Sequence, residues 1–105
     1  MKKYKNIIVV GALMALPSVS FSADVTSITN AEMSATTCFL CHGPEGKAVG
    51  GSIPPLAGYP ESVLAQQLKA FKNGTRESTV MGRHMKGYTD DEIDEIAKYF
   101  STLKP

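Results

Sequence analysis

The stretch CFLCHG, residues 38–43, contains both cysteines of the chain and one of its two histidines. Two thiols separated by two residues and followed at once by an imidazole suit the covalent attachment of a haem. Each sulfur can add to one vinyl group of the porphyrin, and the histidine can ligate the iron. If the stretch forms one helical turn, Cys38, Cys41 and His42 reach the same edge of the macrocycle.

Three other roles for the cysteine pair stay open on the residues alone. A structural zinc site needs further cysteine or histidine ligands at its own spacing, and His84 is the only one left in the sequence. A redox dithiol of the thioredoxin type expects a strand–helix–strand setting that the sequence does not indicate. A simple disulfide would close too small a loop to stabilise a domain much. Haem attachment is the role that the spacing favours.

Residues 1–22 have the three parts of a secretory signal peptide. Lysines come first, an apolar run covers residues 7–16, and small residues precede a cleavage site before Ala23. A retained membrane anchor is the alternative, but the apolar run is shorter than the roughly 20 residues that cross a bilayer. We therefore expect a periplasmic protein of residues 23–105, without stable membrane insertion.

The mature chain is small for a domain that must fold on its own core. One domain of this size is marginal without a disulfide, a metal or a buried cofactor, and a porphyrin would complete its interior. The whole chain has a formal net charge of +1, and loss of Lys2, Lys3 and Lys5 with the leader turns this into −2. A mildly acidic domain does not favour a nucleic-acid partner.

Capping signals predict a first and a last helix, each with a threonine N-cap and a glutamate three residues later. The first helix follows Thr29, has Glu32 as its capping-box partner and Met33 in its core face, and runs into the CFLCH stretch. The last helix follows Thr89, with Glu92 in the matching position. Its apolar residues recur at helical spacing: Ile93, Ile96, Ala97, Phe100 and Leu103.

A middle helix and two long loops complete the expected all-α fold. The middle helix begins after Pro60, carries Leu64, Leu68 and Phe71 on one stripe, and stops at Gly74. The sequence has no convincing strand pattern. The segments 43–58 and 75–87 read as loops, and the first is unusually apolar for a solvated loop. Its apolar residues would cover a cofactor: Val49, Ile53, Pro54, Pro55 and Leu56.

The order of motifs resembles a small bacterial class I cytochrome c across essentially the whole mature chain. CxxCH comes first, then PPLAG at 54–58, a methionine, and YTDDEIDEIAKYF at 88–100. The resemblance implies crossing N- and C-terminal helices, with a middle helix and long loops around one covalently bound haem c. It implies Pro55 as the carbonyl acceptor for His42 and Leu56 as a haem contact. A small residue of the first helix, Ala31 or Ala35, would cross Tyr99 and Phe100.

A haem that only passes electrons benefits from a second axial ligand, because an open iron invites reactions with dioxygen. The candidates are Met81, Met85 and His84. A methionine is more often a gap-filler in a core, but Gly82 relieves crowding beside Met81. In class I cytochromes the ligand lies several residues before the final helix, which favours Met81 over Met85. A His/Met pair raises the reduction potential relative to two histidines.

The segment 71–89 is similar to the cytochrome subunit of flavocytochrome c sulfide dehydrogenase in its Phe-Lys-x-Gly, Ser-Thr-x-Met-Gly-Arg and Lys-Gly-Tyr-Thr elements. That resemblance implies a non-catalytic haem subunit that accepts electrons from a sulfide-oxidising FAD flavoprotein. Some members have two haem domains, and this chain has one CxxCH. The alternative is a free carrier between a periplasmic oxidoreductase and a terminal oxidase or reaction centre. A haem enzyme or gas sensor would need an open iron site.

Electron transfer would use the haem edge near the attachment stretch, surrounded by Phe39, Val49 and Ile53. Three lysines could steer a partner or be ordinary solvated surface: Lys47, Lys69 and Lys86. Arg76 and Arg83 could contact haem propionates or form surface salt bridges, for example to Glu77.

Overall fold

The computed structural model describes residues 30–105, so the expected leader, its cleavage site and the Thr29 cap lie outside the described residues. Within residues 30–105 the chain is helical and has no strand, which confirms the all-α prediction. The elements in order are α1 (Asn30–Thr36), α2 (Phe39–His42), a 3-10 helix η1 (Pro44–Gly46), α3 (Glu61–Asn73), α4 (Met81–Met85) and α5 (Asp90–Thr102).

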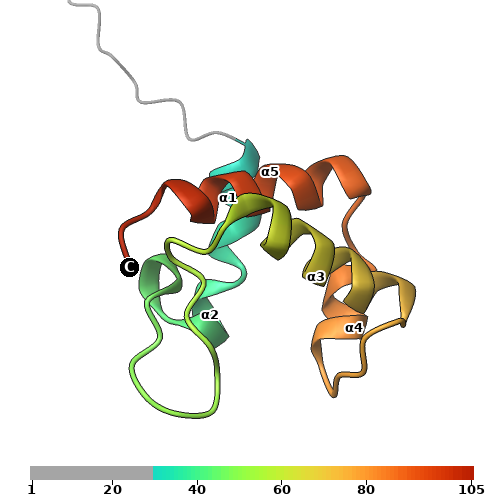
Figure 1. Cartoon of the computed structure of the whole chain (residues 1–105), viewed down its shortest axis with the longest axis horizontal. Helices are drawn as coiled ribbons and strands as arrows, with labels where there is room; N and C mark the ends of the chain where they lie inside the picture. The colour runs from blue at the N-terminus through green and yellow to red at the C-terminus, as the bar shows by residue number, and fades with distance from the viewer. Residues whose placement is uncertain (1–29) are drawn as a thin grey trace, which may run out of the picture.

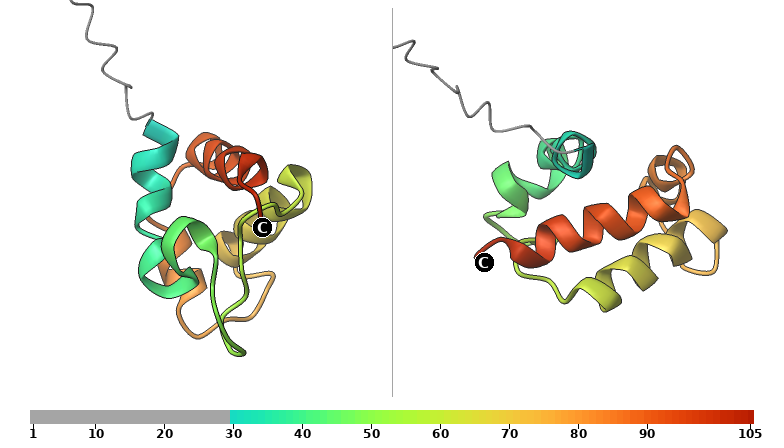
Figure 2. Two further views of the ribbon diagram at one scale, coloured as in Figure 1. Left: turned by 90° about the vertical axis from the view of Figure 1, so that its left-hand side faces the viewer. Right: turned by 90° about the horizontal axis from the view of Figure 1, so that it is seen from above.

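Three helices form the upper part of the molecule in Figure 1. α1 crosses α5, as expected for the first and last helices, and α3 runs alongside α5 (Figures 1 and 2). α2 and the loop after it lie below this layer on one side, and α4 lies below it on the other (Figure 1). The fold therefore brings the segment with the two cysteines and the segment with the methionines to opposite sides of one space.

The core contains the apolar stripes that the helical spacing predicts. Phe100, Ile93 and Ile96 of α5 are buried, together with Leu64 and Leu68 of α3. Phe71 and Leu103 pack against this cluster from partly buried positions. Ala35 is fully buried in the same cluster, so it is the small residue at the crossing of α1 with α5.

Both ends of α3 and the start of α5 follow the predicted signals. The Glu92 N–H donates to Thr89 Oγ1 at 3.2 Å, and the Thr89 N–H donates to Glu92 Oε2 at 2.7 Å, so the capping box is complete. Pro60 precedes the first residue of α3, and Gly74 ends that helix with a left-handed φ of 76°.

Two predictions about the first helix are wrong. The helix does not run through the CFLCH stretch, because the Thr36 and Thr37 hydroxyls donate to the carbonyls of Met33 and Ser34 and compete with the helical ladder. A turn at Thr37 and Cys38 separates α1 from α2. Met33 is 60% exposed rather than in the core, because it lies two residues from Ala35 and thus on nearly the opposite side of the helix.

The loop of residues 43–58 is attached to the core near both of its ends, and Gly46 is buried beside Phe100. Leu56 and Ala57 are buried, and their N–H groups donate to the carbonyl of Gly46 at 2.8 and 3.2 Å. Val49 is fully exposed and Ile53 is 41% exposed. Part of the apolar surface of this loop therefore faces outward rather than covering the protein interior.

The short helix α4 lies inside the segment that the sequence analysis assigns to a loop. The Ser78 hydroxyl accepts a hydrogen bond from the Gly82 N–H at 2.7 Å, which satisfies a free donor near the start of the helix. Met85, at its end, is 1% exposed and belongs to the core. The four-residue spacing of Met81 and Met85, with Ser78 before them, is the signal that could have predicted this turn.

Candidate functional site

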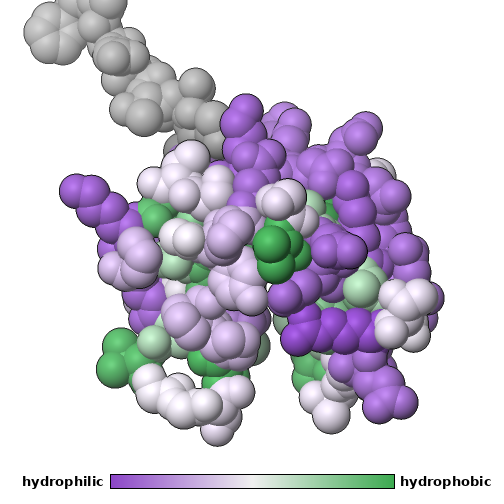
Figure 3. Space-filling view, in the orientation of Figure 1, coloured by the Kyte–Doolittle hydropathy of each residue, from purple (hydrophilic) through white to green (hydrophobic). Residues whose placement is uncertain are grey.

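A cavity lies between the α2 side and the α4 side of the molecule. Its volume, which includes space open to solvent, is about 510 Å³. The inner surface of the cavity consists of four core residues, Leu56, Leu68, Ile96 and Phe100. The side with the two cysteines contributes Thr37, Cys38, Cys41 and His42. The α4 side contributes Val80, Met81, His84 and Met85. Figure 3 shows a notch between the two sides at the lower edge, with hydrophobic residues beside it.

His42 is held at the cavity by the backbone of the loop. Its side chain is only 7% exposed, and Nδ1 lies 2.7 Å from the carbonyl oxygen of Pro54. A carbonyl only accepts hydrogen bonds, so Nδ1 carries the proton and donates it. Nε2 is then the unprotonated nitrogen with a free lone pair, which is the form of the ring that can ligate a metal.

The acceptor for His42 is therefore Pro54, and the prediction of Pro55 is wrong by one residue. The peptide that carries the Pro55 carbonyl also carries the Leu56 N–H, which donates to Gly46. In a trans peptide the N–H and the carbonyl point in opposite directions, so the Pro55 carbonyl is turned away from Gly46. The preceding carbonyl is the one that faces the imidazole. Leu56 lines the cavity as expected.

Both cysteines are free thiols, and both line the cavity. Burial raises the pKa of the Cys38 thiol above its ordinary value, and this outweighs the opposing effect of the nearby Thr37 hydroxyl. Within residues 30–105 no three His, Cys, Asp or Glu side chains come together as a metal site. That leaves the two thiols without the further ligands that a structural zinc site requires.

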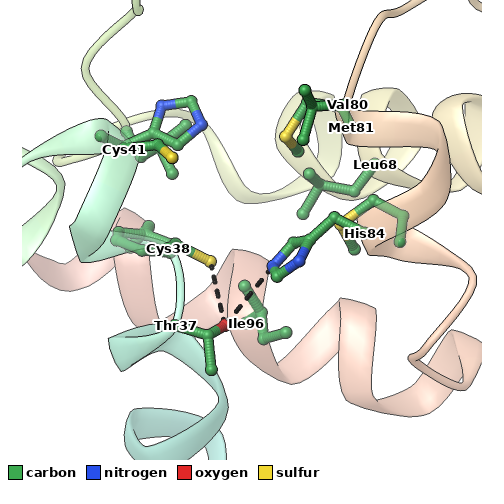
Figure 4. A pocket seen from close by; sticks show the side chains of 12 residues that line it. Thr37, Cys38, Cys41, Leu68, Val80, Met81, His84 and Ile96 are labelled. Carbon is green, nitrogen blue, oxygen red and sulfur yellow. Dashed lines mark hydrogen bonds between the residues drawn. The ribbon is translucent and has the colours of Figure 1, made fainter.

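The opposite side of the cavity carries all three candidates for a second axial ligand. Met81 is partly buried, His84 is partly buried, and Met85 is almost completely buried in the core. Figure 4 shows Met81 and His84 on the side of the cavity that faces Cys38 and Cys41. The His84 ring is turned toward the hydroxyl of Thr37, at 3.5 Å from Nε2 to Oγ1.

The charged residues singled out in the sequence are mostly engaged elsewhere. Arg76 donates to Gln67 Oε1 at 2.7 Å and lies 4.5 Å from the ring centroid of Phe71, so it stacks on α3 rather than pairing with Glu77. Lys47 pairs with Glu45. Lys69 pairs with Asp94, whose hydrogen bond raises the pKa of Lys69.

Comparison with known proteins agrees with this geometry. The model of the family described as "Cytochrome c" matches residues 30–104. The chain belongs to the cytochrome c family. This match and the all-helical structure confirm the predicted fold, that of a small class I cytochrome c. Proteins of this family are electron carriers, and a covalently bound haem c defines them. No helix among the described residues of this cytochrome is long and apolar enough to cross a membrane.

Relatives of this cytochrome include parts of sulfur-oxidising systems and a small cytochrome of its own size. It is 46% identical over 72 residues to the cytochrome subunit of sulfide dehydrogenase of Chlorobaculum tepidum, which covers 69% of this chain and 64% of the relative. It is 42% identical over 69 residues to the thiosulfate dehydrogenase electron acceptor of Stutzerimonas stutzeri, covering 63% of this chain and 32% of the relative. Cytochrome c-553 of Helicobacter pylori is 32% identical over 102 residues, covering 95% and 99%.

The cavity fits a haem c. Its lining is apolar apart from thiols, imidazoles and one hydroxyl, which suits a porphyrin. The two thiols stand on one side together with an imidazole whose Nε2 is free, and a second set of soft or nitrogen donors stands on the other. The structure adds residues to this site that the sequence analysis missed, above all Pro54 as acceptor and Thr37 beside His84.

Proposed function

We propose that this cytochrome transfers electrons in the periplasm through one haem c with histidine and methionine as axial ligands. The observation that carries the proposal is the placement of Met81 across the cavity from Cys38, Cys41 and His42. When bound, the haem supplies a one-electron iron couple. Residues of the chain bind it, fix its ligands and exclude water.

On the attachment side, Cys38 and Cys41 would hold the porphyrin through thioethers, and His42 would ligate the iron through Nε2. The Pro54 carbonyl keeps the proton on Nδ1, orients the ring and strengthens it as a ligand. Because His42 is nearly buried, this hydrogen bond is little exposed to competition from water.

On the opposite side, Met81 is the better candidate for the second ligand than Met85. Met85 is 1% exposed and fills the core with Ile93, Ile96 and Phe100, which is the usual role of a buried methionine. Met81 is only partly buried, at the first residue of α4, and its side chain borders the cavity. A His/Met pair in an apolar site favours the ferrous state, because low dielectric disfavours the additional positive charge of ferric iron.

Two leucine substitutions test this assignment. Met81→Leu should remove the thioether ligand, let carbon monoxide bind readily to the reduced protein, and lower the reduction potential. Met85→Leu is the matched control, because it removes the sulfur of the other methionine of α4 and nearly conserves side-chain volume. This substitution should lower the free energy of unfolding by less than about 1.5 kcal/mol. If Met85→Leu alone opened the iron to carbon monoxide, the roles of the two methionines would be reversed.

The partner we propose is a sulfide-oxidising FAD flavoprotein, with this chain as its haem subunit and the flavin as the site of bond chemistry. The proposal is supported by the likeness to a protein named as the cytochrome subunit of sulfide dehydrogenase. Such a subunit must present an electron-transfer edge. Around Cys41 the structure exposes Leu40 (92%), Val49 (102%) and Ile53 (41%), which border one shallow hollow. An apolar edge of this kind suits contact with a protein partner.

A free carrier is the second candidate, and one observation favours it. The chain matches a small cytochrome c-553 over nearly the full length of both proteins. A permanent subunit buries more surface than a transient redox contact, which stays below about 1,200 Å². Gel filtration of native periplasmic extract, followed at haem and flavin absorbances, separates the two. Haem and flavin eluting together support the subunit, and haem at the size of a small monomer without flavin supports the carrier.

A further inference from the structure

A hydrogen-bonded cluster around Thr37 joins the attachment side of the cavity to the α4 side. The Thr37 Oγ1 lies 2.7 Å from the hydroxyl of Tyr88 and 3.5 Å from Nε2 of His84, and it donates to the Ser34 carbonyl at 2.8 Å. The His84 and Tyr88 rings also meet edge to face, with centroids 5.6 Å apart. Thr37 is thus the point at which residues far apart in sequence meet.

The donors and acceptors at Thr37 can be counted. A threonine hydroxyl has one proton and two lone pairs, and the proton is given to the Ser34 carbonyl. Tyr88 must therefore donate to Thr37, and His84 must donate through an Nε2–H. In the haem protein the Cys38 sulfur, 4.0 Å from Thr37 Oγ1, is a thioether without an S–H and only a weak acceptor, so the Ser34 carbonyl at 2.8 Å keeps the proton of Thr37.

These hydrogen-bond partners assign opposite tautomers to the two histidines at the cavity. In His42 the proton is on Nδ1, held by the Pro54 carbonyl, and Nε2 is free to ligate iron. In His84 the proton is on Nε2, and that nitrogen has no lone pair for a metal. Since His84 borders the same cavity only three residues after Met81, it is the nearest nitrogen competitor for the second axial position.

We propose that Thr37 is a positioning residue that decides the second axial ligand, by holding the Nε2–H of His84 and leaving the iron to the Met81 thioether. The inference rests on the proposed His/Met ligation. Without the hydroxyl, His84 can change tautomer and turn its Nε2 lone pair toward the iron. An imidazole donates more strongly to ferric iron than a thioether does, so the exchange lowers the reduction potential.

The test uses three single variants of the full haem-loaded protein. Thr37→Val removes the hydroxyl and keeps the branched shape. Thr37→Ser keeps the hydroxyl. Thr36→Val is the matched control, because the Thr36 hydroxyl also donates to a carbonyl three residues earlier, at 2.6 Å to Met33, but does not reach His84. The readouts are the axial-ligand signature of the ferric haem in absorption and magnetic circular dichroism, and the midpoint potential.

We expect Thr37→Val to lose the thioether signature, to gain that of two imidazoles and to shift the midpoint potential downward. Thr37→Ser and Thr36→Val should match the wild type. Adding His84→Gln to Thr37→Val should remove the two-imidazole signature and restore methionine ligation. Thermal unfolding of each variant checks that the domain stays folded, so a change of ligand is not mistaken for loss of structure.

Two results would overturn the inference: Thr37→Val with the ligand signature and potential of the wild type, or a Thr37→Val defect that His84→Gln does not repair. Failure of the proposed function looks different. In that case the wild-type protein itself lacks the thioether signature, or Met81→Leu leaves it in place.

Discussion

Replacing Gly46 by alanine should strongly destabilise the haem protein, because the added methyl group would press on the core. Gly46 has a φ of 72°, and a Cβ there would lie 2.7 Å from Phe100 Cε1 and 3.0 Å from the Cβ of Leu56. A left-handed conformation costs a non-glycine residue about 1–2 kcal/mol. Forcing a methyl group into a packed core costs about 1–3 kcal/mol more. The expected loss is therefore about 2–5 kcal/mol, out of about 4–12 kcal/mol for a domain of this size.

Gly74→Ala is the matched control, because its φ of 76° is nearly the same and nothing lies within 4 Å of the position of its Cβ. It should cost only the backbone term of about 1–2 kcal/mol. Denaturant unfolding of the haem-loaded proteins measures both losses. The difference between them isolates the contact with Phe100.

A double-mutant cycle of Gly46→Ala and Phe100→Leu tests whether the added methyl group clashes with the Phe100 ring. Phe100→Leu removes the ring atoms that the new methyl group meets, so Gly46→Ala should cost less in that background, and the two losses should not add. Equal losses for Gly46→Ala and Gly74→Ala, or additivity with Phe100→Leu, would show that the loop does not press on Phe100.

Three further perturbations have expected outcomes. Thr89→Ala removes half of the capping box and should cost about 0.5–2 kcal/mol in thermal unfolding, with the haem spectrum unchanged; an unchanged Tm would show that the box contributes nothing. Hydrogen bonds from Thr89 hold the pKa of Glu92 below its ordinary 4.5, so this stabilisation is present above that value and is lost as pH falls through the folded pKa. Glu92→Gln should flatten the fall of stability with acid, and parallel curves would contradict this. Val49→Asp, at a fully exposed position, should change stability by less than about 0.5 kcal/mol but slow haem reduction by a donor flavoprotein; an unchanged rate would place the edge elsewhere.

Much of the fold follows from chemistry that is local in the sequence. The capping box consists of Thr89 and Glu92, three residues apart, and Gly74 ends α3 by its own conformation. The sequence alone therefore predicts where α3 begins and ends and where α5 begins. The attachment residues are equally local. CxxCH places two thiols and an imidazole on adjacent turns, and the structure brings all three to one cavity even though Thr36 and Thr37 interrupt the helix.

Two of the errors outside the first helix occur where a contact distant in sequence decides the structure. Pro54 rather than Pro55 accepts from His42, because the Gly46 carbonyl takes the Leu56 N–H and turns the intervening peptide. The short helix α4 depends on the burial of Met85 against α3 and α5, a contact that the four-residue spacing of Met81 and Met85 does not reveal by itself.

The two histidines depend both on local sequence signals and on contacts distant in sequence. The tautomer of His42 depends on a loop twelve residues away, and that of His84 on a hydroxyl 47 residues earlier in the chain. Sequence spacing identifies His42 as a ligand, since it follows the cysteines directly, but gives no means to exclude His84, which lies beside the candidate methionine. The exclusion comes from one threonine whose only proton is already donated to Ser34. Because that bond leaves Thr37 able only to accept, the local fold of α1 determines which nitrogen of a residue on α4 carries hydrogen. The choice between thioether and imidazole at the iron, and with it the reduction potential, then depends on how the first helix ends.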